Sequence, residues 1–238
     1  MANLTQLRML EDLDGFLLID KPAGIPFATV VKTVKHKFNL VKVGHGGSLD
    51  AMATGLFVVL VNGANRFVAD VMGADRYWSG TIRLGRRTNT GDVHGDTVVE
   101  RDADVSEEQL SAALAEFRGD IFQTEPRFCS VRREDRGCYE VADTGDHQQF
   151  LSHIYNLKVT PNDDGRLAFE VSGTKSLLPR ALADDFGEAL GCGACLESLR
   201  RKKIGSFSVE EAIPFDRLLD TDIVDFASCV KPLSTFLR

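Results

Sequence analysis

The chain has 238 residues, a formal net charge of −7 and a pI near 5.3. Hydrophobic residues make up 43% and charged residues 26%, which is typical of a folded globular protein and excludes a disordered or collagen-like chain. The longest apolar run, Leu56 to Val61, is far shorter than the roughly 20 residues of a membrane-spanning helix. Because the first residues form no apolar signal core, we expect a cytoplasmic protein with reduced cysteines and no membrane partner.

The charge distribution bears on possible partners. A net negative chain does not coat nucleic acid by bulk electrostatics. Basic residues nevertheless cluster at 32–42, 83–87, 127–136 and 200–203. Each cluster alone is typical of a solvated surface, but together they allow one positive face on an acidic body.

The first half of the chain alternates strand-like and helix-like patterns. Short apolar runs bounded by turn residues predict strands, and apolar residues three and four apart predict helices. In chain order these patterns predict a strand at 15–19, a helix around 30–38, a strand at 56–61, a helix at 65–72 and a strand at 77–84.

The second half begins with a capping signal. Ser106 and Gln109 form a capping box ahead of a helix that stops at Gly119. Alternating residues at 155–159 and 167–171 flank a turn and predict a hairpin, and a helix follows at 180–190. Since no strand–helix–strand rhythm occurs, we predict an α+β fold with a mixed, mainly antiparallel sheet flanked by helices.

We interpret residues 1–238 as one domain with two unusual segments. Residues 123–149 are polar, basic and aperiodic, and they are too many for a plain connection. We therefore predict an insertion that closes over a ligand. Residues 216–238 form a short, acidic tail.

Common cofactor motifs are not found in the sequence. It contains neither a phosphate-binding P-loop nor a dinucleotide-binding glycine pattern. Cys192 and Cys195 form a single C-x-x-C without a second pair, which indicates buried thiols rather than zinc ligands or a redox pair. We therefore predict neither a metal nor a cofactor.

The glycine-rich loop at 44–55 could place a carboxylate next to a ligand. It delivers Asp50 just ahead of a fully apolar strand that would fix its position. A lone aspartate in a turn is more often a turn former, so the residues alone favour that structural interpretation. A Ser48–His45–Asp50 triad is excluded, because residues so close in one loop cannot adopt triad geometry.

Five ordered blocks of the sequence resemble the TruB family of tRNA pseudouridine synthases. The resemblance covers about residues 15–215 and centres on Asp50. The blocks are GFLLIDKPAGIP, GHGGSLDAMATGLFVVLVNGANRF, DRYWSGTIRLGRRTNTGDVHGD, TEPRFCSVRREDRGCYEVADTG and ADDFGEALGCGACLESLRRKKIGSFSVEEA.

The resemblance implies isomerisation of a T-loop uridine of tRNA, uridine 55, to pseudouridine on a pseudouridine synthase fold. It implies a T-arm stem-loop as partner, no cofactor, no metal and a monomeric enzyme. The uracil must leave the base stack and enter a pocket. A carboxylate, by family pattern Asp50, then assists while the glycosidic bond breaks and the base turns to bond through C5.

The resemblance also implies roles for further residues. Tyr77 matches the tyrosine that stacks on the target base and takes the C5 proton. Arg180 matches an arginine paired with the catalytic carboxylate, and His45 matches a histidine that helps displace the base. The remaining residues implied to line the pocket or bind RNA are Lys21, Leu178, Leu199, Arg132 and Arg133, the last two within the RNA-clamping insertion at 123–149.

The sequence departs from the family pattern in several places. Three additional residues precede Arg180, and Leu178 stands where a pocket tyrosine is usual. Only 23 residues follow Phe215, too few for an appended RNA-binding PUA domain, so we expect a short form. Two functions stay open: an active tRNA uridine isomerase, and a catalytically weakened RNA-binding or RNA-folding module.

Overall fold

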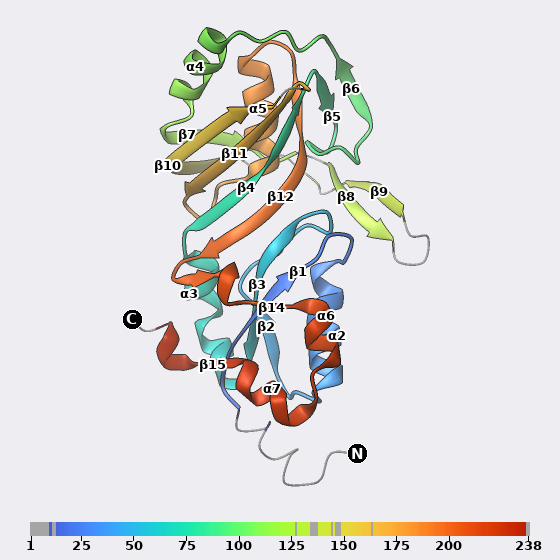
Figure 1. Cartoon of the computed structure of the whole chain (residues 1–238), viewed down its shortest axis with the longest axis vertical. Coiled ribbons are helices and arrows are strands. Elements are labelled where there is room, and N and C mark those ends of the chain that lie inside the picture. The colour runs from blue at the N-terminus through green and yellow to red at the C-terminus, as the bar shows by residue number, and fades with distance from the viewer. Residues whose placement is uncertain are drawn as a thin grey trace. The chain divides into compact units, whose positions relative to one another are not determined.

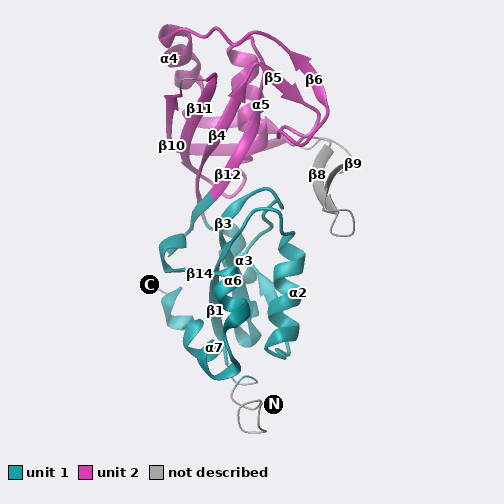
Figure 2. Cartoon of the chain, turned by 45° about the vertical axis from the view of Figure 1, so that its right-hand side comes forward, with its two compact units in different colours: residues 1–74, 201–238 teal, residues 75–200 magenta. Residues whose placement is uncertain are grey.

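The chain divides into two compact units. The computed structural model describes residues 10, 13–126, 128–133, 138–143, 145, 149–162 and 164–236. Unit 1 contains residues 1–74 and 201–238, and unit 2 contains residues 75–200 (Figure 2). The chain enters unit 2 after Ala74 and returns to unit 1 inside strand β12 (Ala194–Ile204).

Unit 1 is built around two buried strands. Strands β1 (Gly15–Lys21) and β3 (Thr54–Val61) pair antiparallel, from Gly15 opposite Val61 to Lys21 opposite Gly55. The strand order in this unit is β14-β1-β3-β12. The other strands are β2 (Val43–His45), β13 (Phe207–Ser208), β14 (Ile213–Pro214) and β15 (Val230–Pro232). Residues 55–61 are buried without interruption, which explains why this strand appears in the sequence as an apolar run.

The helices of unit 1 are short. They are α2 (Phe27–Lys37), α3 (Val68–Gly73), α6 (Phe215–Asp220), α7 (Ile223–Cys229) and the 3-10 helices η1 (Asn62–Phe67), η2 (Val209–Glu211) and η3 (Leu233–Thr235). The helix predicted at 65–72 is thus two pieces, because its first turns are 3-10. Asn62 donates to the Leu10 carbonyl and Asn65 to the Leu60 carbonyl, so amide side chains compete with a regular α-helix there.

The carboxyl-terminal segment belongs to the body of unit 1. Strand β15 pairs antiparallel with β1, and Figure 1 shows these red and blue segments side by side. The ring of Phe226 in α7 stacks on Phe38 with centroids 3.7 Å apart. Both rings are buried. The described part of the predicted tail therefore stabilises the fold.

We expect Phe226→Ala to lower the free energy of unfolding by about 3–5 kcal/mol, because it removes a fully buried aromatic ring. Urea denaturation would measure the loss. Val224→Ala on the exposed side of the same helix is the control, with a change within about 0.5 kcal/mol. Equal effects of the two substitutions would contradict a stabilising role for the Phe38 stack.

Unit 2 is an antiparallel sheet with two helices. The strand order is β12-β4-β11-β10-β7, and α5 contacts both β4 and β7. The strands are β4 (Arg76–Leu84), β7 (Gly119–Thr124), β10 (Gln149–Pro161) and β11 (Arg166–Gly173), with the small ladder of β5 (Arg86–Thr88) and β6 (Thr97–Glu100). The helices are α4 (Glu107–Glu116) and α5 (Pro179–Ala189).

Several predicted elements of unit 2 are confirmed. Strands β10 and β11 form the predicted hairpin. The capping box is present. The backbone N–H of Gln109 donates to Ser106 Oγ, and the backbone N–H of Ser106 donates to Gln109 Oε1. The predicted fold class, α+β with a mainly antiparallel sheet, is confirmed.

The predicted insertion at 123–149 contains a hairpin that the sequence did not indicate. Strands β8 (Phe128–Arg133) and β9 (Cys138–Asp143) pair antiparallel. Their residues mix polar and apolar types without strict alternation, so the period-two signal of a strand is weak. The first and last residues of the segment belong to β7 and β10.

None of the helices in the described part of the chain is long and apolar enough to cross a membrane.

Candidate active site

The loop between β2 and β3 carries Asp50. A Cβ at Gly46 would lie 2.3 Å from Val71 Cγ1, so the loop begins where glycine is required by close packing. Leu49 and Ala51 on either side of Asp50 are buried, whereas Asp50 itself is half-buried. The neighbours anchor the loop, and the carboxylate stays partly accessible.

Lys21, at the end of β1, is completely buried. Its Nζ donates to the carbonyls of Pro22 at 2.8 Å, Ile25 at 2.9 Å and Ala51 at 3.2 Å. Burial lowers the pKa of Lys21 to about 8, although the nearby negative charge of Asp50 acts to raise it. The ammonium thus holds the carbonyl that follows Asp50 and lies within the electrostatic reach of its carboxylate.

Arg201 is also buried, with 2% of the residue exposed. Its Nη1 donates to the Ser48 carbonyl at 2.8 Å and its Nε to the Leu56 carbonyl at 2.8 Å, while Nη2 makes a longer contact of 3.5 Å to the Gly47 carbonyl. The interpretation of 200–203 as a basic surface cluster is therefore wrong at this position. Arg201 can be buried on this strand because its guanidinium N–H groups donate to backbone carbonyls.

His45 ends β2 among aromatic rings. Its ring lies 5.1 Å from Phe27 and 5.9 Å from Phe57 between centroids. The Gly47 amide donates to His45 Nδ1 at 3.3 Å, so the neutral ring carries its proton on Nε2. Burial lowers the pKa of His45 below its usual value, which favours this neutral form at pH 7.

Lys21 makes stability depend on pH. Between pH 8 and 10.5 the folded chain has released this proton while the unfolded chain keeps it, so the free energy of unfolding rises with pH. Relative to Lys21→Met, we expect the wild type to gain about 2 kcal/mol between pH 7.5 and 9.5, measured by urea denaturation. Lys35→Met, at an exposed lysine, is the control and should show no such trend. Parallel curves for wild type and Lys21→Met would contradict the burial of a titrating amine.

Tyr77 lies on β4 of unit 2. It is half-buried, and its partner on β11 is Ser172. Its chain neighbours Arg76 and Trp78 are buried. Successive side chains of a strand alternate between the two faces, so Tyr77 points away from the face that holds these neighbours.

The segment ahead of α5 positions Leu178 and Arg180. The buried amide of Gln123 bonds the Leu178 backbone twice, accepting from its N–H at 3.0 Å and donating to its carbonyl at 3.1 Å. Arg180 Nη1 donates to the Thr90 carbonyl at 2.9 Å. The segment that departs from the family pattern is thus held by hydrogen bonds, and it leads directly into the first turn of α5.

The remaining predicted residues lie in or beside unit 2. Leu199 is buried on β12. Arg132 and Arg133 belong to β8, and their side chains lie outside the described residues. Since Asp50 belongs to unit 1 and Arg180 to unit 2, their pairing stays a prediction.

Two residues of the site were not identified from the sequence. Arg201 follows Leu199 by two positions on a strand and therefore shares its buried face, which is the signal that was available. Gln123 likewise sits at a buried position of β7. The sequence pattern does not indicate their roles, because their hydrogen-bond partners lie far away in the chain.

The described residues hold no group of three or more His, Cys, Asp or Glu side chains that could bind a metal ion. Cys192 and Cys195 are both buried free thiols, as the sequence indicated. Burial raises the pKa of Cys195 to about 11, which keeps it protonated and unreactive at neutral pH.

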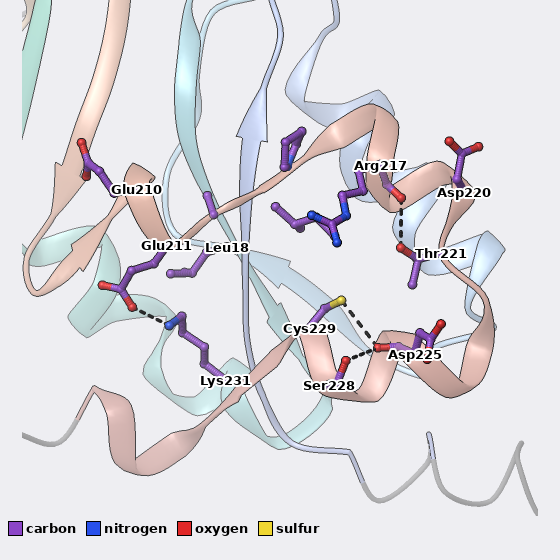
Figure 3. Close-up of a pocket in the computed structure, with 13 residues that line it drawn as sticks. Leu18, Glu210, Glu211, Arg217, Asp220, Thr221, Asp225, Ser228, Cys229 and Lys231 are labelled. Atoms are coloured by element: carbon purple, nitrogen blue, oxygen red, sulfur yellow. Dashed lines mark hydrogen bonds and ion pairs between the residues drawn. The ribbon is translucent and has the colours of Figure 1, made fainter.

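Unit 1 also has a pocket of about 680 Å³ formed by its carboxyl-terminal segments (Figure 3). Among its lining residues are Arg217, Asp225 and Cys229, and Lys231 pairs with Glu211 at its side. None of the predicted site residues is among those that line it in the described part of unit 1. The candidate site is therefore the Asp50 loop and not this pocket.

Comparison with known proteins identifies the family. Residues 35–177 match the TruB family pseudouridylate synthase (N terminal domain), and residues 180–238 match the tRNA pseudouridylate synthase B C-terminal domain. A tRNA pseudouridine synthase B of Burkholderia pseudomallei (strain 668) is 37% identical over 209 residues, which cover 87% of this chain and 69% of the relative. The chain belongs to the TruB family. A TruB relative of the same name from Tolumonas auensis is 36% identical over 210 residues, covering 87% of this chain and 65% of the relative.

Solved structures share the TruB fold of this chain. The "Crystal Structure of a Cbf5-Nop10-Gar1 Complex" contains a chain with a TM-score of 0.72 and 26% identity, and the match covers 97% of this chain and 63% of that one. The "Structure of H/ACA RNP bound to a substrate RNA containing 2'-deoxyuridine" gives a TM-score of 0.71 at 24% identity, covering 97% and 62%. The chain thus spans slightly less than two thirds of these solved chains.

Proposed function

We propose that this chain is a tRNA pseudouridine synthase that isomerises uridine 55 in the T-loop of tRNA. The observation that carries the proposal is the half-buried Asp50 on a loop whose backbone is bonded by two buried cations, Lys21 and Arg201. Membership of the TruB family supports it, as does the name of the relatives, tRNA pseudouridine synthase B.

The reaction leaves the composition of the nucleotide unchanged. The bond from C1′ to N1 of uracil breaks, and a bond from C1′ to C5 forms. The proton on C5 is lost, and N1 gains one. In this proposal the Asp50 carboxylate assists the first bond cleavage, and Tyr77 stacks on the base and takes the C5 proton. By the family pattern, Arg180 pairs with the carboxylate. The proposed reaction uses neither a metal nor a cofactor.

Further residues bind the substrate in this proposal. His45, neutral at pH 7, contacts RNA and helps to displace the base from the stack. Lys21, Leu178 and Leu199 shape the pocket. Arg132 and Arg133, on the hairpin of β8 and β9, contact the T-arm stem-loop.

In this proposal residues 1–238 are one catalytic domain. The enzyme works as a monomer in the cytoplasm, where its tRNA substrate is found.

We expect the wild type to release tritium from tRNA labelled at uridine C5, and Asp50→Asn to release none above background while its affinity for tRNA stays within about threefold. The neutral amide cannot act as nucleophile, whereas phosphate contacts spread over the surface are kept. Asp70→Asn, at an exposed position of unit 1, is the control with full activity. If the wild type binds tRNA but releases no tritium, the chain is an RNA-binding module and not an active isomerase.

We expect Tyr77→Phe to bind tRNA normally and to turn over about 10²- to 10⁴-fold more slowly, because the ring still stacks while the hydroxyl for proton transfer is lost. Single-turnover tritium release and a filter-binding assay measure the two effects. Tyr155→Phe, at an exposed tyrosine of the same unit, is the matched control. Equal rates for Tyr77→Phe and wild type would make Tyr77 a packing residue.

A further inference from the structure

Among the described residues, Arg201 is the largest side chain that is fully buried. A buried guanidinium is costly to desolvate unless good acceptors surround it. Two carbonyls that accept from it, those of Ser48 and Gly47, belong to the loop just before Asp50, and another, that of Leu56, belongs to the strand just after it. Arg201 therefore ties both ends of the loop to strand β12.

Lys21 holds the same loop on the other side of Asp50. Its ammonium has three N–H groups, and it donates to three carbonyls, one of which is that of Ala51. Arg201 lies close enough for its charge to lower the pKa of Lys21. The backbone is thus bonded by one buried cation before Asp50 and by another after it.

Gly47 gives the loop a conformation that needs such support. Its φ is +118°, a region open to glycine and rarely adopted by other residues. Glycine has many alternative conformations, so without Arg201 the segment from Gly47 to Asp50 would sample several of them. A displacement of about 1 Å at a reacting group can reduce a rate about 10²-fold.

We propose that Arg201 is a positioning residue, which acts through the backbone of Gly47 and Ser48 to fix the Asp50 carboxylate for reaction and does not contact RNA. The inference rests on the proposed function. It excludes the interpretation of Arg201 as a phosphate contact, because the side chain is buried.

The first test compares Arg201→Lys with wild type. Lysine keeps the charge but cannot reach three separated carbonyls with the fork of a guanidinium. We expect kcat for tritium release to fall about 10- to 100-fold, while KM for tRNA stays within about threefold. Lys203→Gln is the matched control, for which kcat should be unchanged.

The second test is the dependence of kcat on pH. When Lys21 loses its charge, its amine keeps two N–H groups for three carbonyls, so we expect kcat of the wild type to fall above about pH 8. Arg201→Met removes the positive charge that lowers the pKa of Lys21, and this fall should move to higher pH. In Arg201→Lys, which keeps a positive charge, it should move less. A general loss of folded protein would lower kcat by the same factor at every pH and would not shift the pH at which kcat falls.

The outcomes separate this inference from the proposed function. A wild type that releases no tritium overturns the proposed function, and the inference with it. An active wild type with full kcat in Arg201→Lys overturns the inference alone. A raised KM at unchanged kcat would make Arg201 an RNA contact, which also overturns it. If Arg201→Met does not fold, Arg201→Lys and the wild-type pH profile decide, and a wild-type profile flat from pH 7 to 10 contradicts the link to Lys21.

Discussion

Hydrogen bonds from two buried cations to loop carbonyls are the interactions on which the candidate site depends. The Ser48 carbonyl lies outside the strand ladders and accepts from the Arg201 guanidinium, and the Ala51 carbonyl accepts from the Lys21 ammonium as well as from the backbone N–H of Gly24. An apolar side chain could fill the same space but offers no donor. The position of Asp50 is therefore coupled to the burial of positive charge, which a protein tolerates only where acceptors are arranged around it.

Local patterns predicted the regular elements well, because short-range interactions form them. The capping box of Ser106 and Gln109 and the hairpin of β10 and β11 depend on residues that are close in sequence. The interactions of Arg201 and Gln123 were not predictable in this way. The Arg201 bond to Leu56 joins residues 145 positions apart, and those of Gln123 to Leu178 join residues 55 apart. From the sequence alone, a basic or amide residue is expected at the surface, and only a known partner indicates that it is buried.

The altered segment before α5 has a defined conformation held by its own hydrogen bonds. The Leu177 amide donates to the Thr174 carbonyl at 3.0 Å, which forms a turn, and Pro179 begins the helix in the position where its fixed φ is favourable. Arg180 then falls in the first helical turn, within reach of the Thr90 carbonyl. The resemblance identified Asp50, Tyr77 and Arg180 as the residues of interest, but this bonding pattern could come only from the structure.

The division of the chain into units has a consequence for its synthesis. Unit 2 is one continuous segment, whereas unit 1 is made from residues at both ends of the chain. During translation β1 can pair with β3 early, but β14 and β15 on its other edge are made last. Until then β1 presents an unpaired strand edge, a surface prone to intermolecular pairing. The nascent chain is therefore most exposed to aggregation after unit 2 has emerged from the ribosome and before residues 213–232 have followed.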